Sequence, residues 1–331
     1  SLVWLDPTRS GGSIDRLAKT AFFPDLGLAL VRDGWDANDC AAMFKCSPYG
    51  GAKLNEYRNA NDFHYVNVAH DDPDINSFQL YARGATLAET SRYSKKKLTS
   101  SHNTILVGGK GQRGEGQGWT QPLGRGDKDM THLAWVTAWK DAGDVAVVEG
   151  EGGGAYPDLD RYRRTFVWVK GAYVLVLDDI RAAGDKDVEL AWLVQGPQLT
   201  TTDEAAGRYI LSKAGAQCEF QVACQPPLAG SVGVSTADNR GKPLGWQQLR
   251  LTGKAGAFRV ASAYDLWARG EVGVEMTPGD DGAVAVRVRA RGVDDTWTWR
   301  PAGPRAPSSL TGARSGKAFV AVTEKDAPPA P

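Results

Sequence analysis

The sequence predicts an all-β protein, a large antiparallel β-sandwich of stacked sheets with little helix. Three observations support this fold class. Short runs of alternating or β-rich residues recur along the whole chain of 331 residues. The 39 glycines and 17 prolines are scattered rather than periodic, as many turns between short strands require. No helical pattern long enough to connect parallel strands separates the runs, so the strands are expected to pair antiparallel.

The predicted strands are bounded by turn residues along the whole chain. The clearest pair is a hairpin, in which 165–169 and 173–177 flank a turn at Gly171. The one helical stretch expected lies near 13–19, where Ser13 is a suitable N-cap. In chain order the predicted strands are 28–31, 64–68, 77–82, 104–107, 133–139, 145–149, 162–169, 173–177, 188–194, 218–223, 249–252, 257–263, 284–290, 296–300 and 318–323.

Composition and charge limit the function classes. Basic and acidic side chains number 39 each, which argues against a nucleic-acid-binding protein, since that class needs a basic surface. An acidic polysaccharide stays compatible, because a local cluster of Arg and Lys suffices to bind it. The sequence has no apolar run of about 18 residues, so no membrane span is predicted. The four cysteines do not have zinc-site spacing, and we expect them to be reduced and buried.

Residues with metal-binding or catalytic chemistry concentrate between positions 64 and 102, where three of the four histidines lie. His70, Asp72 and Asp74 stand at alternate positions, so on an extended segment their side chains share one face. One imidazole and two carboxylates on one face are costly unless a cation sits among them. Glu89 and His102 would complete a mixed nitrogen and oxygen site. The alternative is a turn whose carboxylates cap backbone amides.

This window resembles the β domain of the heparinase II/III-like polysaccharide lyases. The family's His-x-His-x-Asp-x-x-Ser-Phe strand is similar to 70–78. A glycine followed by a Leu-x-x-Asp segment is similar to Gly84 and 87–90, and a His-Asn-Thr-x-x-Val segment to 102–107. The resemblance covers roughly residues 20–195 and implies the β-sandwich of that family.

The resemblance also implies a metal ion, which in the family is zinc with a mainly structural role. The matching positions are Asp72, where the family has His, Glu89, which stands one position early, and His102. A set richer in carboxylate than in imidazole also suits a harder cation. We therefore expect a divalent metal ion, zinc by resemblance, with calcium or manganese as alternatives.

Four residues are implied for the cleft that binds the sugar acid. His70 matches a histidine that lines the cleft, and Tyr93 is the nearest match to the tyrosine that transfers the proton. Asn103 and Lys95 are the predicted substrate-binding residues, since a lysine attracts a uronate carboxylate. The alternative for each is structural: a buried histidine, packed tyrosine, turn-capping amide or solvated lysine.

The implied reaction is β-elimination on a uronic-acid-containing polysaccharide, such as alginate or a heparin/heparan-type glycosaminoglycan. In the family, an α/α toroid domain upstream supplies the rest of the active site, so this chain is expected to need it as a partner. Residues 1–20 are interpreted as a linker from that helical domain and 21–240 as the β-sandwich. Residues 241–331 would complete the sandwich or form a small C-terminal β subdomain. A periplasmic or secreted location is expected.

Two other function classes remain open from the residues. A non-catalytic carbohydrate-binding module would present exposed aromatics, and the chain has 11 tryptophans. Tryptophan also fills large cores, so the number alone does not decide. The second class is a scaffold domain whose metal site is purely structural. A glycosidase is disfavoured, because no two carboxylates can be placed at the required separation.

Overall fold

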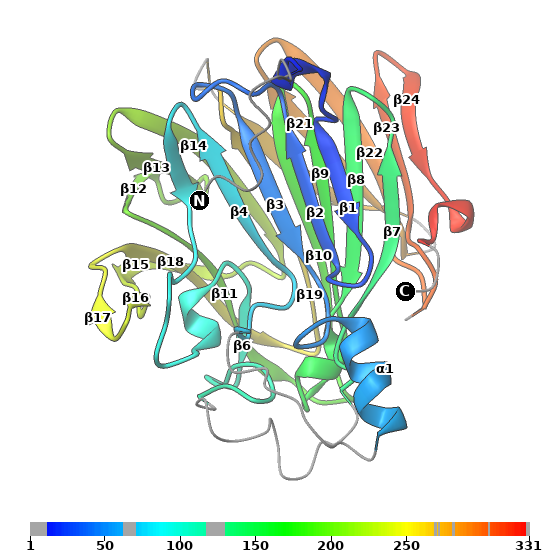
Figure 1. Ribbon diagram of the computed structural model, residues 1–331. Helices are drawn as coiled ribbons and strands as arrows, with labels where there is room; N and C mark the ends of the chain where they lie inside the picture. Colours follow the sequence, from blue (N-terminus) through cyan, green and yellow to red (C-terminus); the bar gives the residue numbers. More distant parts are fainter. Residues whose placement is uncertain are drawn as a thin grey trace.

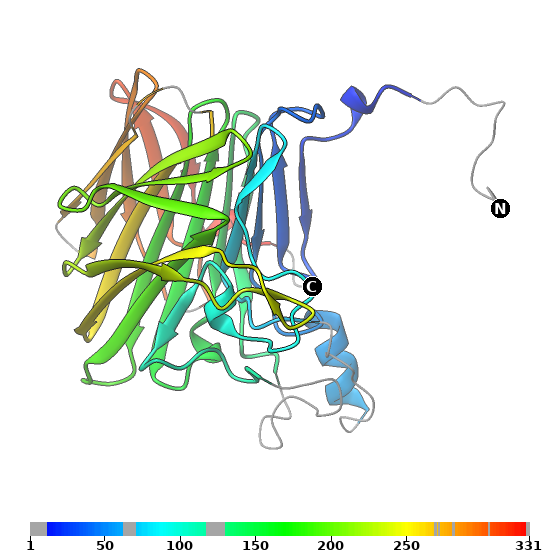
Figure 2. The same ribbon diagram turned by 90° about the vertical axis from the view of Figure 1, so that its left-hand side faces the viewer.

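Strands in three stacked layers form the body of the protein, as Figure 1 and Figure 2 show from two sides. The computed structural model describes residues 12–61, 71–116, 130–267, 270, 272–279, 282–303 and 305–328. Neighbouring strands pair antiparallel, from β1 with β2 to the long pair of β9 with β10. The predicted antiparallel all-β sandwich is confirmed.

One outer layer is a five-stranded sheet in the order β1-β2-β3-β4-β5. The middle layer is an eight-stranded sheet in the order β12-β13-β14-β19-β10-β9-β8-β7. The strands of the outer layer are β1 (Thr20–Phe23), β2 (Leu28–Arg32), β3 (Ala41–Lys45), β4 (Ser77–Ala82) and β5 (Ala85–Ala88). Those of the middle layer are β7 (Trp135–Asp141), β8 (Val145–Glu151), β9 (Leu159–Val169), β10 (Tyr173–Ala182), β12 (Gln198–Asp203), β13 (Arg208–Lys213), β14 (Ala216–Gln225) and β19 (Ala257–Asp265).

The other outer layer is a second five-stranded sheet, β20 to β24, and a four-stranded sheet in the order β15-β18-β11-β6 adjoins one end of the sandwich. The strands of the second outer layer are β20 (Gly273–Pro278), β21 (Val284–Ala290), β22 (Val293–Arg300), β23 (Ser309–Arg314) and β24 (Lys317–Val322). The remaining strands are β6 (Ile105–Val107), β11 (Val188–Gly196), β15 (Ala229–Val234), β18 (Gln247–Ala255) and the hairpin β16 (Asp238–Asn239) with β17 (Lys242–Pro243).

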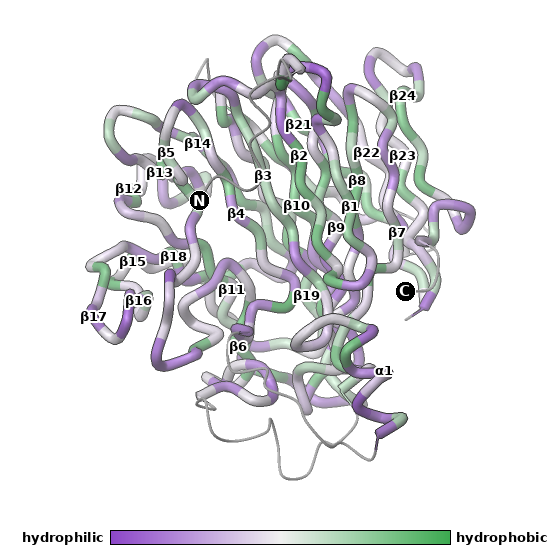
Figure 3. Tube along the Cα trace, viewed as in Figure 1, coloured by the Kyte–Doolittle hydropathy of each residue, from purple (hydrophilic) through white to green (hydrophobic). Residues whose placement is uncertain are grey.

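The middle sheet is buried on both faces, which explains its apolar sequence. On β9, Phe166 and Trp168 pack into the core shared with the first outer sheet, whereas Val167 and Val169 face the second outer sheet. A continuous apolar run in a short strand is the pattern that burial on both faces requires. Figure 3 shows hydrophobic residues concentrated along these central strands and polar residues in the loops at the ends.

Helix is scarce, but one α-helix, α1 (Ala52–Ala60), was not predicted. It has no apolar stripe to reveal it, because its two buried side chains are the polar Asn55 and Arg58. The predicted turn near Ser13 is present as the 3₁₀ helix η1 (Ile14–Arg16), where the Ser13 hydroxyl accepts from Asp15 N–H. The other short 3₁₀ helices are η2 (Thr99–Ser101), η3 (Gly153–Ala155) and η5 (Glu324–Asp326). The predicted strand 64–68 lies outside the described residues.

The strands after residue 240 divide between two roles. β18 pairs with β11 and β15, and β19 pairs with β10 and β14, so both belong to sheets built largely by earlier residues. β20 to β24 pair with one another and form the second outer layer. The last third of the chain therefore both completes the sandwich and adds a layer to it.

The four cysteines are free, as predicted; three are buried and Cys224 is half-buried. Burial raises the pKa of the Cys40 thiol to about 12 and, with the nearby Asp178 carboxylate, that of Cys224 to about 12. Both are therefore thiols rather than reactive thiolates near neutral pH. In the part of the chain that is described, we find no helix with the length and apolar character needed to cross a membrane.

Candidate functional site

Three aspartates that precede β4 lie beside the end of β3. Lys45, the last residue of β3, pairs with the first residue of β4, so its side chain reaches these aspartates past the strand ends. The Lys45 Nζ lies 2.5 Å from Asp71 Oδ1 and 2.8 Å from Asp74 Oδ1. Burial favours a raised pKa for Asp71, but the Lys45 charge and hydrogen bond outweigh it and lower that pKa. Burial raises the pKa of Asp74 above its ordinary value.

The third aspartate, Asp72, is neutralised from a different segment. Lys97, in the loop between β5 and η2, has its Nζ 3.0 Å from Asp72 Oδ1. His102, which follows η2, is only 1% exposed and lies within the electrostatic field of this group. Burial lowers its pKa, the carboxylates of Asp74 and Asp72 oppose that shift, and Lys45 and Lys97 reinforce it. We call these six residues the aspartate–lysine cluster.

His102 is unusual within the cluster because neither ring nitrogen has a hydrogen-bond partner among the described residues. By contrast, both the amide nitrogen and the amide oxygen of the neighbouring Asn103 side chain form hydrogen bonds. The Asn103 amide donates to the carbonyl of Phe78 at 2.8 Å, and its Oδ1 accepts from Gln195 N–H at 2.8 Å. Asn103 is 0% exposed, so its side chain joins the end of β4 to β11 beneath the surface.

A buried arginine holds the two segments of the site in place. Arg164 on β9 is 0% exposed and forms a two-pronged ion pair with Asp178 on β10, at 2.7 and 3.0 Å. Its Nη1 donates to the backbone carbonyls of Asn76 and Asn103, at 2.6 and 2.7 Å. Asp178 also accepts from the indole N–H of Trp192 at 2.8 Å. This network fixes the loop before β4 and the segment after η2 onto the middle sheet.

Tyr93 lies on the same loop as Lys97, and the loop is clamped by the β16–β17 hairpin. The buried carboxylate of Asp238 accepts from the Ser94 hydroxyl at 3.1 Å and from the N–H groups of Lys95 and Gly241, at 3.4 and 2.9 Å. The Arg240 N–H donates to the Tyr93 carbonyl at 2.7 Å. Tyr93 itself is 45% exposed. An exposed phenol is thus carried by a loop with a fixed backbone.

Exposed cationic residues lie on the loop that carries Tyr93 and on the hairpin that clamps it. The loop exposes Arg92, Lys95 and Lys96, and the hairpin exposes Arg240 and Lys242. Besides Asp238, this region contains the acid Glu89, which is largely buried and is paired with Arg92 at 3.4 Å and with Lys213 at 3.2 Å. These five cations make a positive surface suited to a polyanion. The Tyr93 surface, as we call it, consists of Arg92, Tyr93, Lys95, Lys96, Arg240 and Lys242.

The predicted metal ligands are not assembled as a set. Glu89 is held by the two cations just named, whereas Asp72 and His102 belong to the aspartate–lysine cluster. Across the described residues, no three His, Cys, Asp or Glu side chains are grouped so that they could hold a metal ion. Within the described ranges, the side chains therefore do not assemble a set that fits the divalent ion implied by the resemblance. His70 lies outside the described residues, so its predicted role in the cleft stays a prediction.

Several residues that the sequence analysis did not assign to the site form its ion pairs and its positive surface. Lys45 is 26 residues from Asp71 and only the pairing of β3 with β4 brings it there. Lys97 follows Lys95 and Lys96 in the sequence, yet its side chain turns inward to Asp72 while theirs are exposed. Nothing in the sequence pointed to Arg240 and Lys242 as site residues. Only the hairpin's contact with residues 89–98, which we call the Tyr93 loop, shows their position.

The buried contacts of Asn103 lead to a direct test of its role. Replacing Asn103 by Leu is expected to destabilise the protein by roughly 2–5 kcal/mol, because the Phe78 carbonyl and the Gln195 N–H lose their partner in the interior. Urea unfolding measures this, with Asn61→Leu at an exposed position as the matched control. A variant that keeps its stability but loses polysaccharide binding would instead support the predicted contact with substrate.

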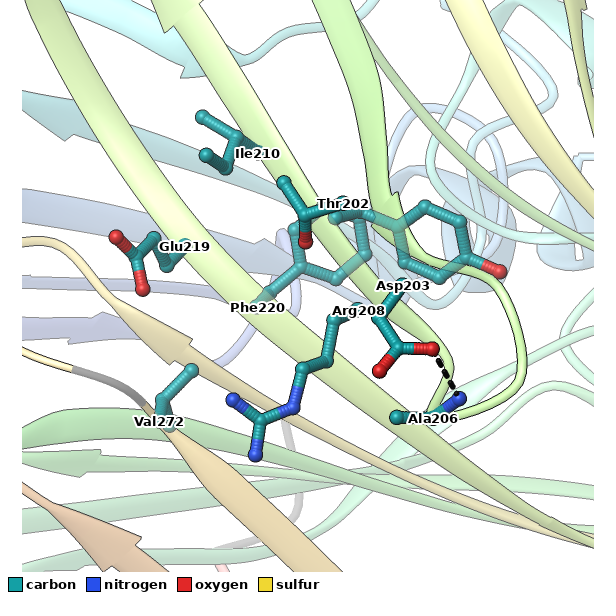
Figure 4. A pocket seen from close by; sticks show the side chains of 9 residues that line it. Thr202, Asp203, Ala206, Arg208, Ile210, Glu219, Phe220 and Val272 are labelled. Atoms are coloured by element: carbon teal, nitrogen blue, oxygen red, sulfur yellow. Dashed lines mark hydrogen bonds between the residues drawn. The ribbon is translucent and has the colours of Figure 1, made fainter.

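A separate hollow of about 550 Å³ lies on the middle sheet, over β12, β13 and β14. Figure 4 shows Arg208, Asp203 and Glu219 around it. The Asp203 carboxylate accepts from the Ala206 N–H at 3.0 Å, so it caps the turn between β12 and β13. None of the residues predicted for the site lines this hollow.

Comparisons with known proteins agree on one family. The family model described as heparinase II/III-like, C-terminal, matches residues 15–262. A solved structure of heparinase III is similar to this chain with a TM-score of 0.63 and 13% identity, over 85% of this chain and 42% of that protein. A heparan sulfate lyase HepC mutant from Pedobacter heparinus is similar with a TM-score of 0.58 and 16% identity, over 89% of this chain and 42% of that protein. A comparison with curated proteins finds no match. The chain thus spans less than half the length of the solved proteins that it resembles.

Proposed function

This chain belongs to the heparinase II/III-like C-terminal family, and from that premise we propose that it supplies the β-domain half of a polysaccharide lyase active site. The other half would be an α/α toroid domain, on the same or a separate polypeptide. The observation that carries the proposal is the Tyr93 surface, where an exposed phenol stands among five cations on a clamped loop.

The arrangement suits β-elimination on a uronic acid. The C5 proton is weakly acidic, and cations beside the uronate carboxylate stabilise the charge that develops when it leaves. A base takes that proton, the bond from C4 to the glycosidic oxygen breaks, and an acid protonates the oxygen. We assign the proton transfer to Tyr93 and the binding of the carboxylate to Lys95 with Arg240. His70 would line the same cleft.

The density of cations favours a highly charged chain as substrate. Five exposed cations on two adjoining segments match a polymer that carries sulfate as well as carboxylate groups. We therefore place heparin/heparan-type glycosaminoglycans ahead of alginate. Because such polymers lie outside cells, the proposal includes a periplasmic or secreted location.

Absorbance of the unsaturated product tests the proposal against its competitors. Heparan sulfate, chondroitin sulfate and alginate are each incubated with the chain alone and with the chain joined to the toroid domain. Product only in the joined form supports a shared active site. Binding without product in both forms would indicate a carbohydrate-binding module, and neither binding nor product a scaffold domain.

Charge reversal on the Tyr93 surface is expected to weaken polysaccharide binding. With Lys95, Arg240 and Lys242 all changed to Glu, affinity for heparan sulfate should fall at least about tenfold, and its salt dependence should flatten. The matched control changes Arg287, Arg289 and Lys317 to Glu on the second outer layer, where all three side chains are exposed. Titration at two salt concentrations measures both effects. Equal losses in the two variants would mean that only overall charge matters.

A further inference from the structure

The aspartate–lysine cluster carries an inference that does not depend on lyase activity. Asp71, Asp72 and Asp74 lie within a stretch of four residues. Like charges so close together destabilise one another unless cations lie between them. Two ammonium groups from distant segments do so, at 2.5 to 3.0 Å. The cluster therefore already contains cations of its own.

The charges of the cluster nearly balance without a metal ion. Three carboxylates and the two ammonium groups that pair with them leave one net negative charge. A divalent ion would add two positive charges next to two ammonium groups that are fixed in place. Repulsion at such short range opposes its binding.

The positions of the partners also fit a substitute for a metal ion. Lys45 comes from the end of β3, Lys97 from the Tyr93 loop, and the aspartates from the segment before β4. The three ion pairs thus connect three segments of the chain. Their side chains are only 9 to 20% exposed, so solvent screens the pairs weakly.

We propose that the ammonium groups of Lys45 and Lys97 take the place of a divalent cation in this chain, so that the cluster pins the Tyr93 loop without metal. Glu89, the third predicted metal ligand, is consistent with this proposal, because its carboxylate pairs with Arg92 and Lys213 and not with the cluster. Such a site holds its loop in the presence of chelators.

Metal analysis and chelation test the proposal on the intact chain. Mass spectrometry of the purified protein, after incubation with zinc, calcium or manganese and removal of excess ion, should find far less than one ion per chain. A ligand that binds the folded state raises the melting temperature, so removing a bound ion would lower it. If no ion is bound, chelation with EDTA should leave the melting temperature unchanged. One tightly held ion per chain, or a fall in melting temperature on chelation, overturns the proposal.

Lysine variants test the mechanism separately. Lys97→Met keeps the length of the side chain but removes its charge, and should lower the melting temperature by roughly 5 °C. Lys97→Arg restores the charge and should stay close to the parent protein. Lys96→Met, at the exposed neighbouring position, is the matched control. If Lys97→Met unfolds no earlier than Lys96→Met, the ion pair does not hold the loop and the proposal fails. Should Lys97→Met not fold, Lys97→Arg together with the metal content still decides the question.

Discussion

Lyase activity is expected to fall by a factor of about 100 to 10,000 when Tyr93 is replaced by Phe, which is the range for loss of a general acid–base group. The substitution removes a single oxygen atom from a side chain that is 45% exposed. The surrounding cations and the clamped backbone remain, so polysaccharide binding and unfolding should change little. The effect is therefore expected in kcat and not in KM, measured with heparan sulfate on the chain joined to the proposed toroid domain.

Tyr57→Phe provides the matched control, because Tyr57 is a second exposed tyrosine, on α1, 56% exposed. It should leave kcat unchanged. Full activity in Tyr93→Phe would assign the proton transfer to another group, with His70 the next residue to replace. A loss in KM alone would make Tyr93 a binding residue and not a catalytic one.

Removing one partner of the buried Arg164–Asp178 pair is expected to destabilise the fold by about 3–5 kcal/mol. Asp178→Ala leaves the guanidinium charged and without its carboxylate in a fully buried position. It also removes the acceptor of the Trp192 indole N–H. Since Arg164 holds the carbonyls of Asn76 and Asn103, the candidate site should loosen as well. Urea unfolding measures the loss, and hydrogen exchange at Asn103 and its neighbours reports the loosening.

The control for this prediction is an exposed ion pair of the same type. Arg287 and Asp294 pair on the second outer layer with side chains about half exposed, and Asp294→Ala should lower the stability far less than Asp178→Ala, because solvent screens the exposed pair. The double variant Arg164→Met with Asp178→Leu should recover part of the stability that Asp178→Ala loses, because no unpaired charge remains. Equal losses at the buried and exposed pairs would contradict the role given to Arg164.

The pattern of apolar residues determined the middle of the fold. The runs at 165–169 and 173–177 lie in β9 and β10, because strand positions that pack against apolar neighbours on both faces of a sheet are mostly apolar. Strands at the rim of the sandwich were not predicted, because they lack this burial and therefore this apolar pattern. β12 is exposed at all but one of its positions, so burial imposes little pattern on its sequence. The helix α1 escaped notice because it buries polar side chains.

The sequence by itself determined the fold class, the family and the segment in which the site lies, because each depends on the local order of residues. Asp72, His102 and Tyr93 could be singled out for that reason. Only the tertiary structure decided their partners. Lys45 reaches the aspartates through the register of β3 on β4, Lys97 through an inward turn of its loop, and Glu89 is diverted to Lys213. Neutralisation of a buried charge depends on distance in space, and separation along the chain carries no information about it.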